Sequence, residues 1–231
     1  MLTGAGQHYQ MVVLPKMSSS QHSIRAAYDV ASEAYARKFI SELDDKPLDR
    51  ELLKQFAAIV GAERLVLDIG CGPGHTTAHL TALGLMAIGV DLSPKMIEKA
   101  SALFPQSRFV VGDFFALPNK SSSIAGILAF YCIVHLTPAQ LGPAFSEMFR
   151  VLSRGGVVLL SFHVGSEVVH AENFLDTNAV LDFTFFEPFQ IESALRTVGF
   201  DPIDIRIGEP YEVEHPSKRC YIVAHKPQSM A

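Results

Sequence analysis

The chain has 231 residues, a formal net charge of −5, 48% apolar residues and 19% charged residues. This apolar content excludes a disordered chain, and the length predicts one large domain or a core with a modest cap. The net negative charge argues against broad binding to the phosphate backbone of nucleic acids, which requires clustered Lys and Arg.

The cysteines and the start of the chain bear on the cell compartment. Cys71, Cys132 and Cys220 lie far apart in no CxxC or CxxH pattern, so neither a disulfide framework nor a metal site is expected. Residues 1–16 lack the basic start and apolar core of a signal peptide, and no apolar run reaches the ~20 residues of a membrane helix. We therefore expect a cytoplasmic protein with no membrane partner, whose residues 1–20 form a flexible lead-in.

Two helices are predicted between residues 21 and 61. Apolar residues recur there in two sets at three- and four-residue spacing. An Asp-Asp-Lys-Pro run at residues 44–47 separates the sets, and Gly61 ends the second.

From residue 62 the pattern alternates between strands and helices. Strands are predicted at residues 65–69, 86–90, 108–111, 124–130, 157–162, 203–207 and 220–224. Helices are predicted at residues 75–83, 94–104, 138–152 and 188–198. This alternation predicts an α/β fold with a mostly parallel sheet and helices on both faces. Only residues 208–218 separate the last two strands, which favours a hairpin and an antiparallel last strand at or near the sheet edge.

The strongest local signal is a glycine-rich turn between the first of these strands and the following helix. Asp68, Gly70 and Gly72 stand where the strand ends, so the backbone there can approach a ligand closely. Dinucleotide enzymes place a glycine at the position of His75 and need no acid before the first glycine. The pattern therefore favours a ligand with a positive group over a pyrophosphate. The alternative is that the glycines only form a tight turn and bind no ligand.

Two further acids stand at strand ends. Asp91 ends the second strand, 21 positions after Gly70, where a carboxylate can accept hydrogen bonds from ribose hydroxyls. Asp113 follows the third strand beside Phe114, whose ring can stack on a base, although an acid there can also cap a helix or form a turn. Together with Asp68, these acids follow three successive strands, which indicates a nucleoside ligand.

The combination resembles the class I S-adenosylmethionine-dependent methyltransferases, in particular those that act on small molecules. The resemblance runs from about residue 28 to 226, and its matching segments are residues 66–75, 89–96, 112–118, 127–136 and 149–160. The family implies a Rossmann-like, seven-stranded sheet with an antiparallel last strand. It also implies S-adenosyl-L-methionine as cofactor and S-adenosyl-L-homocysteine as product.

The resemblance also implies which residues bind the cofactor. They are Asp68, Gly70, Cys71 and Gly72 around the methionine part, Asp91 at the ribose, Asp113 and Phe114 at the adenine, and Phe130 beside the sulfonium, with Leu92 and Met96 as further contacts. Tyr28 and Tyr35 belong to a segment that resembles the helix folding over the cofactor in this family. Residues 21–61 would thus cover the cofactor site of a core that spans residues 62–231. The alternative for the first helix is ordinary packing on the sheet.

Two histidines are candidate catalytic residues. The activated cofactor supplies the difficult chemistry, and the protein mainly aligns the reacting atoms, so a base matters only when the acceptor must lose a proton. His135 follows the fourth strand and His163 the fifth, on the rim where open α/β sheets bind ligands. The alternative for each is a structural hydrogen bond.

An insertion at about residues 165–190 is predicted as a small helical cap. It contains five acids, five Phe and no Lys or Arg. Because the family commonly builds its substrate cap here, Phe185, Phe186 and Tyr131 are expected to contact an aromatic or cationic small molecule in an apolar pocket with a negative surround. The alternative is a solvated acidic face whose Phe residues pack on the sheet.

The sequence therefore predicts methyl transfer to an O or N atom of a small molecule, by a monomer or homodimer. The alternative is a catalytically silent protein of the same fold with a regulatory or scaffold role. Asp68 and His75 disfavour an NAD-linked dehydrogenase. Transfer to nucleic acid is disfavoured because no Asn/Asp-Pro-Pro-Tyr run follows the fourth strand.

Overall fold

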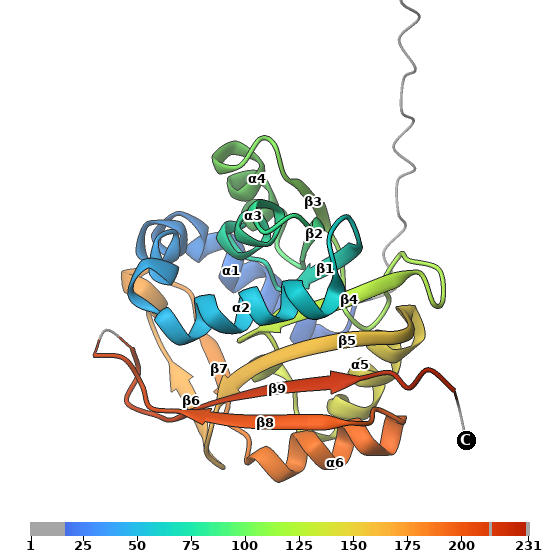
Figure 1. The fold of residues 1–231 in the computed structure, drawn as a ribbon. Coiled ribbons are helices and arrows are strands. Elements are labelled where there is room, and N and C mark those ends of the chain that lie inside the picture. The colour runs from blue at the N-terminus through green and yellow to red at the C-terminus, as the bar shows by residue number, and fades with distance from the viewer. Residues whose placement is uncertain (1–16, 213, 230–231) are drawn as a thin grey trace, which may run out of the picture.

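A seven-stranded sheet forms the centre of the molecule, in the order β3-β2-β1-β4-β5-β9-β8 (Figure 1). The computed structural model describes residues 17–212 and 214–229. The strands of this sheet are β1 (Leu65–Ile69), β2 (Met86–Asp91), β3 (Arg108–Val111), β4 (Ile124–Phe130), β5 (Leu152–His163), β8 (Ile203–Gly208) and β9 (Arg219–His225). The predicted Rossmann-like architecture is confirmed, with every predicted strand present.

The strand directions also follow the prediction. Strands β3, β2, β1, β4 and β5 pair in parallel. The last strand, β9, lies between β5 and β8 and is antiparallel to both. Strand β9 is therefore one position from the edge, and β8 forms the edge itself.

Helices cover both faces of the sheet (Figure 1). They are α1 (Ser19–Phe39), α2 (Pro47–Val60), α3 (His75–Ala82), α4 (Pro94–Leu103), α5 (Pro138–Val151) and α6 (Pro188–Val198), with short 3-10 turns η1 (Glu42–Asp45), η2 (Ile133–His135) and η3 (Phe174–Asp176). On one face Leu53 and Phe56 of α2 and Leu80 of α3 pack on the sheet. On the other face Phe145 of α5 and Leu195 of α6 bury themselves against it. This two-sided burial explains why the central strands are nearly continuous apolar runs.

The first helix begins earlier than the sequence indicated. Ser18 caps it: its hydroxyl accepts from the Gln21 backbone at 3.2 Å, and the Gln21 side chain accepts from the Ser18 backbone at 2.8 Å. Reciprocal capping of this kind ends the lead-in at Ser18, so Ser19 and Ser20 are helical. The rest of the predicted lead-in, residues 1–16, lies outside the described residues.

The insertion after β5 differs from the predicted helical cap. Strands β6 (Val168–Ala171) and β7 (Leu181–Thr184) pair in an antiparallel hairpin, joined through the short η3 turn. Val168 and Val169 of β6 and Phe183 and Thr184 of β7 are β-branched or aromatic, and such residues favour strands. The cap is thus a two-stranded ribbon.

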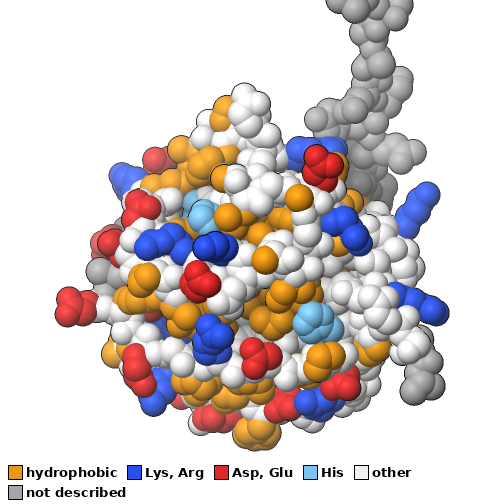
Figure 2. Space-filling model, viewed as in Figure 1, with side chains coloured by type: hydrophobic (Ala, Val, Ile, Leu, Met, Phe, Trp, Pro, Cys, Tyr) orange, Lys and Arg blue, Asp and Glu red, His pale blue; other side chains and the backbone are white. Residues whose placement is uncertain are grey.

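The surface mixes both signs of charge. On the face shown in Figure 2, Lys and Arg side chains are interspersed with Asp and Glu. Among the helices of the described residues, none has both the length and the apolar character needed to cross a bilayer.

Candidate active site

A hollow of about 850 Å³, counting its open mouth, lies at the carboxyl ends of β1, β2, β3 and β4 under helix α1. Most of the residues predicted for cofactor binding line it. These are Tyr28, Tyr35, Gly70, Gly72, Asp91, Leu92, Met96, Asp113, Phe114 and Phe130, and Tyr131 and His135 line it as well. Asp68, Cys71, His163, Phe185 and Phe186 do not line it.

The glycine turn after β1 has the backbone conformation that only glycine adopts readily. Gly70 has φ +70, and a Cβ there would lie 2.5 Å from the Cys132 Cβ. Gly72 has φ +51 and leaves room for the Tyr35 ring. The Gly70 and Cys71 amides both donate to the Val90 carbonyl, which ties the turn to β2.

Asp91 closes the turn from the other side. Its two carboxylate oxygens accept from the amides of Gly72 at 2.9 Å and Ser93 at 2.8 Å. Burial outweighs these bonds and raises the pKa of Asp91 to about 6. Each oxygen keeps a second lone pair, so the side chain can still accept hydrogen bonds from a ligand in the hollow.

Asp68 lies behind the turn. Its side chain is 1% exposed, and one oxygen accepts from the hydroxyls of Thr76 and Thr77, both at 2.6 Å. Burial raises the pKa of this carboxyl in spite of the two hydroxyls. Asp68 therefore holds the first turn of α3 against the end of β1 and does not face the hollow.

Asp113 carries a contact that the sequence did not indicate. The Gln21 side-chain amide of α1 donates to it at 2.6 Å, while the Phe115 amide donates to its other oxygen at 2.9 Å. The rings of Phe114 and Phe115 lie 4.9 Å apart beside it. Helix α1 thus reaches directly over this end of the hollow.

Tyr28 and His135 form a hydrogen-bonded pair in the wall of the hollow. The Tyr28 hydroxyl lies 2.6 Å from His135 Nε2, and His135 Nδ1 lies 3.0 Å from the Asp182 carbonyl. A carbonyl only accepts, so Nδ1 carries the proton and the Tyr28 hydroxyl donates to Nε2. Burial lowers the pKa of His135 to about 4, so its ring is neutral at pH 7.

His163 sits one layer away from the hollow. Its Nδ1 lies 2.9 Å from the Ser217 hydroxyl, and its ring stacks on Phe185 with centroids 4.7 Å apart. Burial and the neighbouring Arg219 lower the pKa of His163 to about 3. Of the two predicted bases, only His135 therefore borders the hollow.

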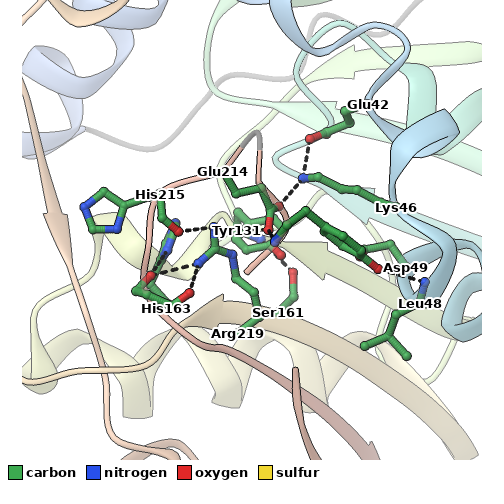
Figure 3. A network of polar contacts seen from close by, with 12 residues as sticks. Glu42, Lys46, Leu48, Asp49, Tyr131, Ser161, His163, Glu214, His215 and Arg219 are labelled. Atoms are coloured by element: carbon green, nitrogen blue, oxygen red, sulfur yellow. Dashed lines mark hydrogen bonds and ion pairs between the residues drawn. The ribbon is translucent and has the colours of Figure 1, made fainter. Parts of the chain in front are cut away.

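Tyr131 joins the hollow to a buried polar network (Figure 3). Lys46 pairs with Glu42 and Glu214, both at 2.6 Å, and its ammonium lies 5.3 Å from the Tyr131 ring centre. The Arg219 guanidinium lies 5.7 Å from the same ring. The sequence predicted none of these charged contacts, because their partners come from η1, the residue before α2, and the loop before β9.

The cap supplies walls behind the hollow. Phe185 is 4% exposed and Phe186 is 1% exposed within the main core. Phe183 packs on the His135 ring and Phe174 on Tyr28. Phe185 and Phe186, which were predicted to contact a ligand, instead pack on His163 and Phe162, outside the lining of the hollow.

Comparison with known proteins agrees with this arrangement. Residues 66–156 match the family model for a methyltransferase domain, and that segment holds the glycine turn, Asp91 and Asp113. This match identifies residues 66–156 as a methyltransferase domain, and the chain is similar to S-adenosylmethionine-dependent methyltransferases.

Individual members of that methyltransferase family are distant in sequence. The chain is 29% identical over 148 residues to malonyl-[acyl-carrier protein] O-methyltransferase of Yersinia pestis, covering 64% of this chain and 53% of that protein. It is 34% identical over 105 residues to norajmaline N-methyltransferase of Rauvolfia serpentina, and this match covers 42% of this chain and 35% of that protein. The matched segments thus span about half or less of these curated relatives.

A solved structure of the family matches over nearly the full length. It is Burkholderia thailandensis 1,6-didemethyltoxoflavin-N1-methyltransferase, with its substrate and S-adenosylhomocysteine bound. The TM-score is 0.64 at 21% identity, and the match covers 94% of this chain and 93% of that one. A likeness at this identity supports the methyltransferase fold.

Proposed function

We propose that this chain binds S-adenosylmethionine in the hollow and transfers its methyl group to an O or N atom of a small molecule. One observation carries the proposal: the glycine turn, Asp91 and Asp113 meet in one hollow whose far end, at the end of β4, is lined by rings. Parallel strands present their carboxyl ends on the same edge, where open α/β sheets bind ligands.

The residues present fit the cofactor. Asp91 and Asp113 offer free lone pairs to the ribose hydroxyls and the adenine amino group, and Phe114 offers a ring face. Phe130 ends β4 next to the glycine turn, in place to pack beside the sulfonium. When bound, the cofactor supplies a methyl group that the acceptor takes in an in-line displacement, the carbon–sulfur bond breaking with its electron pair left on sulfur.

The chain's own contribution to proton removal comes from Tyr28 and His135. An acceptor proton can pass to the Tyr28 oxygen as the Tyr28 proton passes to His135 Nε2, because that hydrogen bond already points from Tyr28 to His135. The Asp182 carbonyl then stabilises the protonated ring. We assign no catalytic step to His163, because the hollow does not reach it.

Calorimetric titration with S-adenosylmethionine tests the cofactor assignment. The wild-type chain is expected to bind, and Asp91→Ala is expected to lose most of the affinity because two hydroxyl acceptors disappear. Asp204→Ala, an exposed change on edge strand β8, serves as the matched control and should bind like wild type. Equal affinity in Asp91→Ala and the control would refute the assignment.

A second experiment separates an enzyme from a silent scaffold. The chain is incubated with labelled cofactor and a broad metabolite extract, and labelled products are sought by chromatography. Labelled product supports transfer, whereas tight cofactor binding with no product would support the scaffold alternative.

A further inference from the structure

We propose that the acceptor is a neutral, flat-ringed small molecule that presents a protic O–H or N–H group, and neither a carboxylate nor an ammonium compound. The inference rests on the proposed function and deepens it. Four features of the described residues carry it: the charges in the hollow wall, the closed ion pairs beside Tyr131, the outward acids of the cap, and the Tyr28–His135 pair.

Charge in the wall is confined to one end of the hollow. The carboxylates among its described lining residues are Asp91 and Asp113, which follow β2 and β3. At the end formed by β4 and η2 the wall is uncharged: it consists of Phe130, Tyr131, Cys132, the neutral His135, Leu136 and Gln140. Burying an ion against such a wall costs several kcal/mol unless a partner charge is present.

The chain's own nearby cations do not supply that partner. Lys46 already bridges Glu42 and Glu214, and Arg219 pairs with Glu214 at 3.3 Å. Both cations lie close to the Tyr131 ring, and neither lines the hollow (Figure 3). An acidic acceptor would have to displace these carboxylates, so the network holds Tyr131 in place and does not receive an anion.

The acids of the cap do not attract a cation into the hollow either. Side chains of Glu172 and Asp182 are 78% and 64% exposed, and both face His170 on the outer surface. Glu167 and Asp176 are also exposed, while Glu187 caps the start of α6. The negative surround expected from the sequence is thus on the outside of the cap, which removes the reason to expect a cationic substrate.

The rest of the wall suits an aromatic acceptor whose O–H or N–H group loses its proton during methyl transfer. Rings of Tyr28, Tyr35, Phe130, Tyr131 and His135 line the hollow, and aromatic groups pack on one another with a preference beyond area alone. The Tyr28 hydroxyl donates to Nε2 of a neutral imidazole, which is the nitrogen that can take up the Tyr28 proton. A carboxylate would have no proton to give this pair, whereas a phenol or a ring N–H would.

Ligand-detected NMR on the full chain saturated with S-adenosylhomocysteine tests the proposal through binding alone. Phenol, benzoate and benzylamine share one ring and differ in charge at pH 7. Phenol is expected to bind at least about tenfold more tightly than either ion. Cyclohexanol is the matched control for ring shape and is expected to bind more weakly than phenol.

The outcomes separate the two proposals. Failure of S-adenosylhomocysteine to bind would count against the proposed function itself. If it binds but benzoate or benzylamine equals or exceeds phenol, or if phenol does not bind at millimolar concentration, the acceptor class is wrong and the cofactor assignment stands.

Discussion

The three aspartates at the strand ends, Asp68, Asp91 and Asp113, have different roles because their surroundings differ. Asp91 and Asp113 face the hollow, while Asp68 is turned inward by two threonine hydroxyls. All three end or follow neighbouring parallel strands, so position along the chain does not separate them. Hydrogen-bond partners and burial decide which carboxylate remains open to a ligand.

Asp49, in α2, makes the stability of the fold depend on pH. It is 1% exposed, accepts from the Tyr221 hydroxyl at 3.0 Å, and burial raises its pKa to about 6. The unfolded chain ionises this group near its ordinary value, so the folded state loses stability as pH rises from about 4 to about 6.

Replacing the Asp49 carboxyl should remove this loss of folding stability at higher pH. At pH 7, Asp49→Asn is expected to raise the free energy of unfolding by about 2 kcal/mol, because it keeps an acceptor for Tyr221 without the buried charge. At pH 4 the two chains should differ little. Urea unfolding across this range measures the difference, with the exposed Asp204→Asn as control. A pH-independent difference would contradict the role given to Asp49.

The Tyr28–His135 pair predicts a dependence on acceptor acidity. For a series of substituted phenols, His135→Ala is expected to lose about 10²-fold or more in kcat with weakly acidic phenols and little with phenols already ionised at pH 7. Tyr28→Phe should show the same trend. A uniform loss across the series would mean that the pair acts only structurally.

At the scale of elements, helix α1 is held over the hollow mainly by polar contacts. Its buried residues are the small Ala27, Ala31, Ser32 and Ala36. The Asp29 carboxylate accepts from the Ser93 hydroxyl at 2.6 Å and the Lys95 amide at 3.1 Å. Because its fully buried side chains are small and its large rings, Tyr28 and Tyr35, are only partly buried, α1 should open more easily than the core helices.

Amide hydrogen exchange of α1 tests whether the Asp29 contacts hold this helix in place. Asp29→Ala is expected to speed exchange by about tenfold, because a charge-assisted bond to Ser93 is worth about 1.5 kcal/mol or more. Glu33→Ala, also on α1, removes an exposed ion pair with Lys99 of α4 and should have little effect. Equal exchange in both variants would show that other contacts hold the helix.

At the scale of the whole molecule, two apolar layers fix the sheet and thus the hollow. Phe56 of α2 is 1% exposed, and its ring lies over Gly126 of β4, where a Cβ would meet it at 2.8 Å. The sheet end that forms the hollow therefore depends on packing on a face that never touches a ligand.

Truncation in that layer should destabilise the entire fold. Phe56→Ala is expected to lower the free energy of unfolding by about 3–5 kcal/mol, through lost burial and a cavity. Ile59→Ala on the same helix, at a side chain 50% exposed, should change it by about 0.5 kcal/mol or less. Denaturant unfolding measures both, and similar losses would contradict this account of the layer.

The sequence by itself determined the order of strands and helices along the chain, the glycine turn and the positions of Asp91 and Asp113 at strand ends, because periodicity and turn chemistry are local signals. Tertiary structure alone decided the contacts between distant segments: Gln21 on Asp113, Tyr28 on His135, and the ion pairs of Lys46 with Glu42 and Glu214. The cap shows the same limit, because its acids and Phe residues were visible in the sequence but their directions were not. Which way a side chain points depends on how remote segments pack, and that information is absent from local pattern.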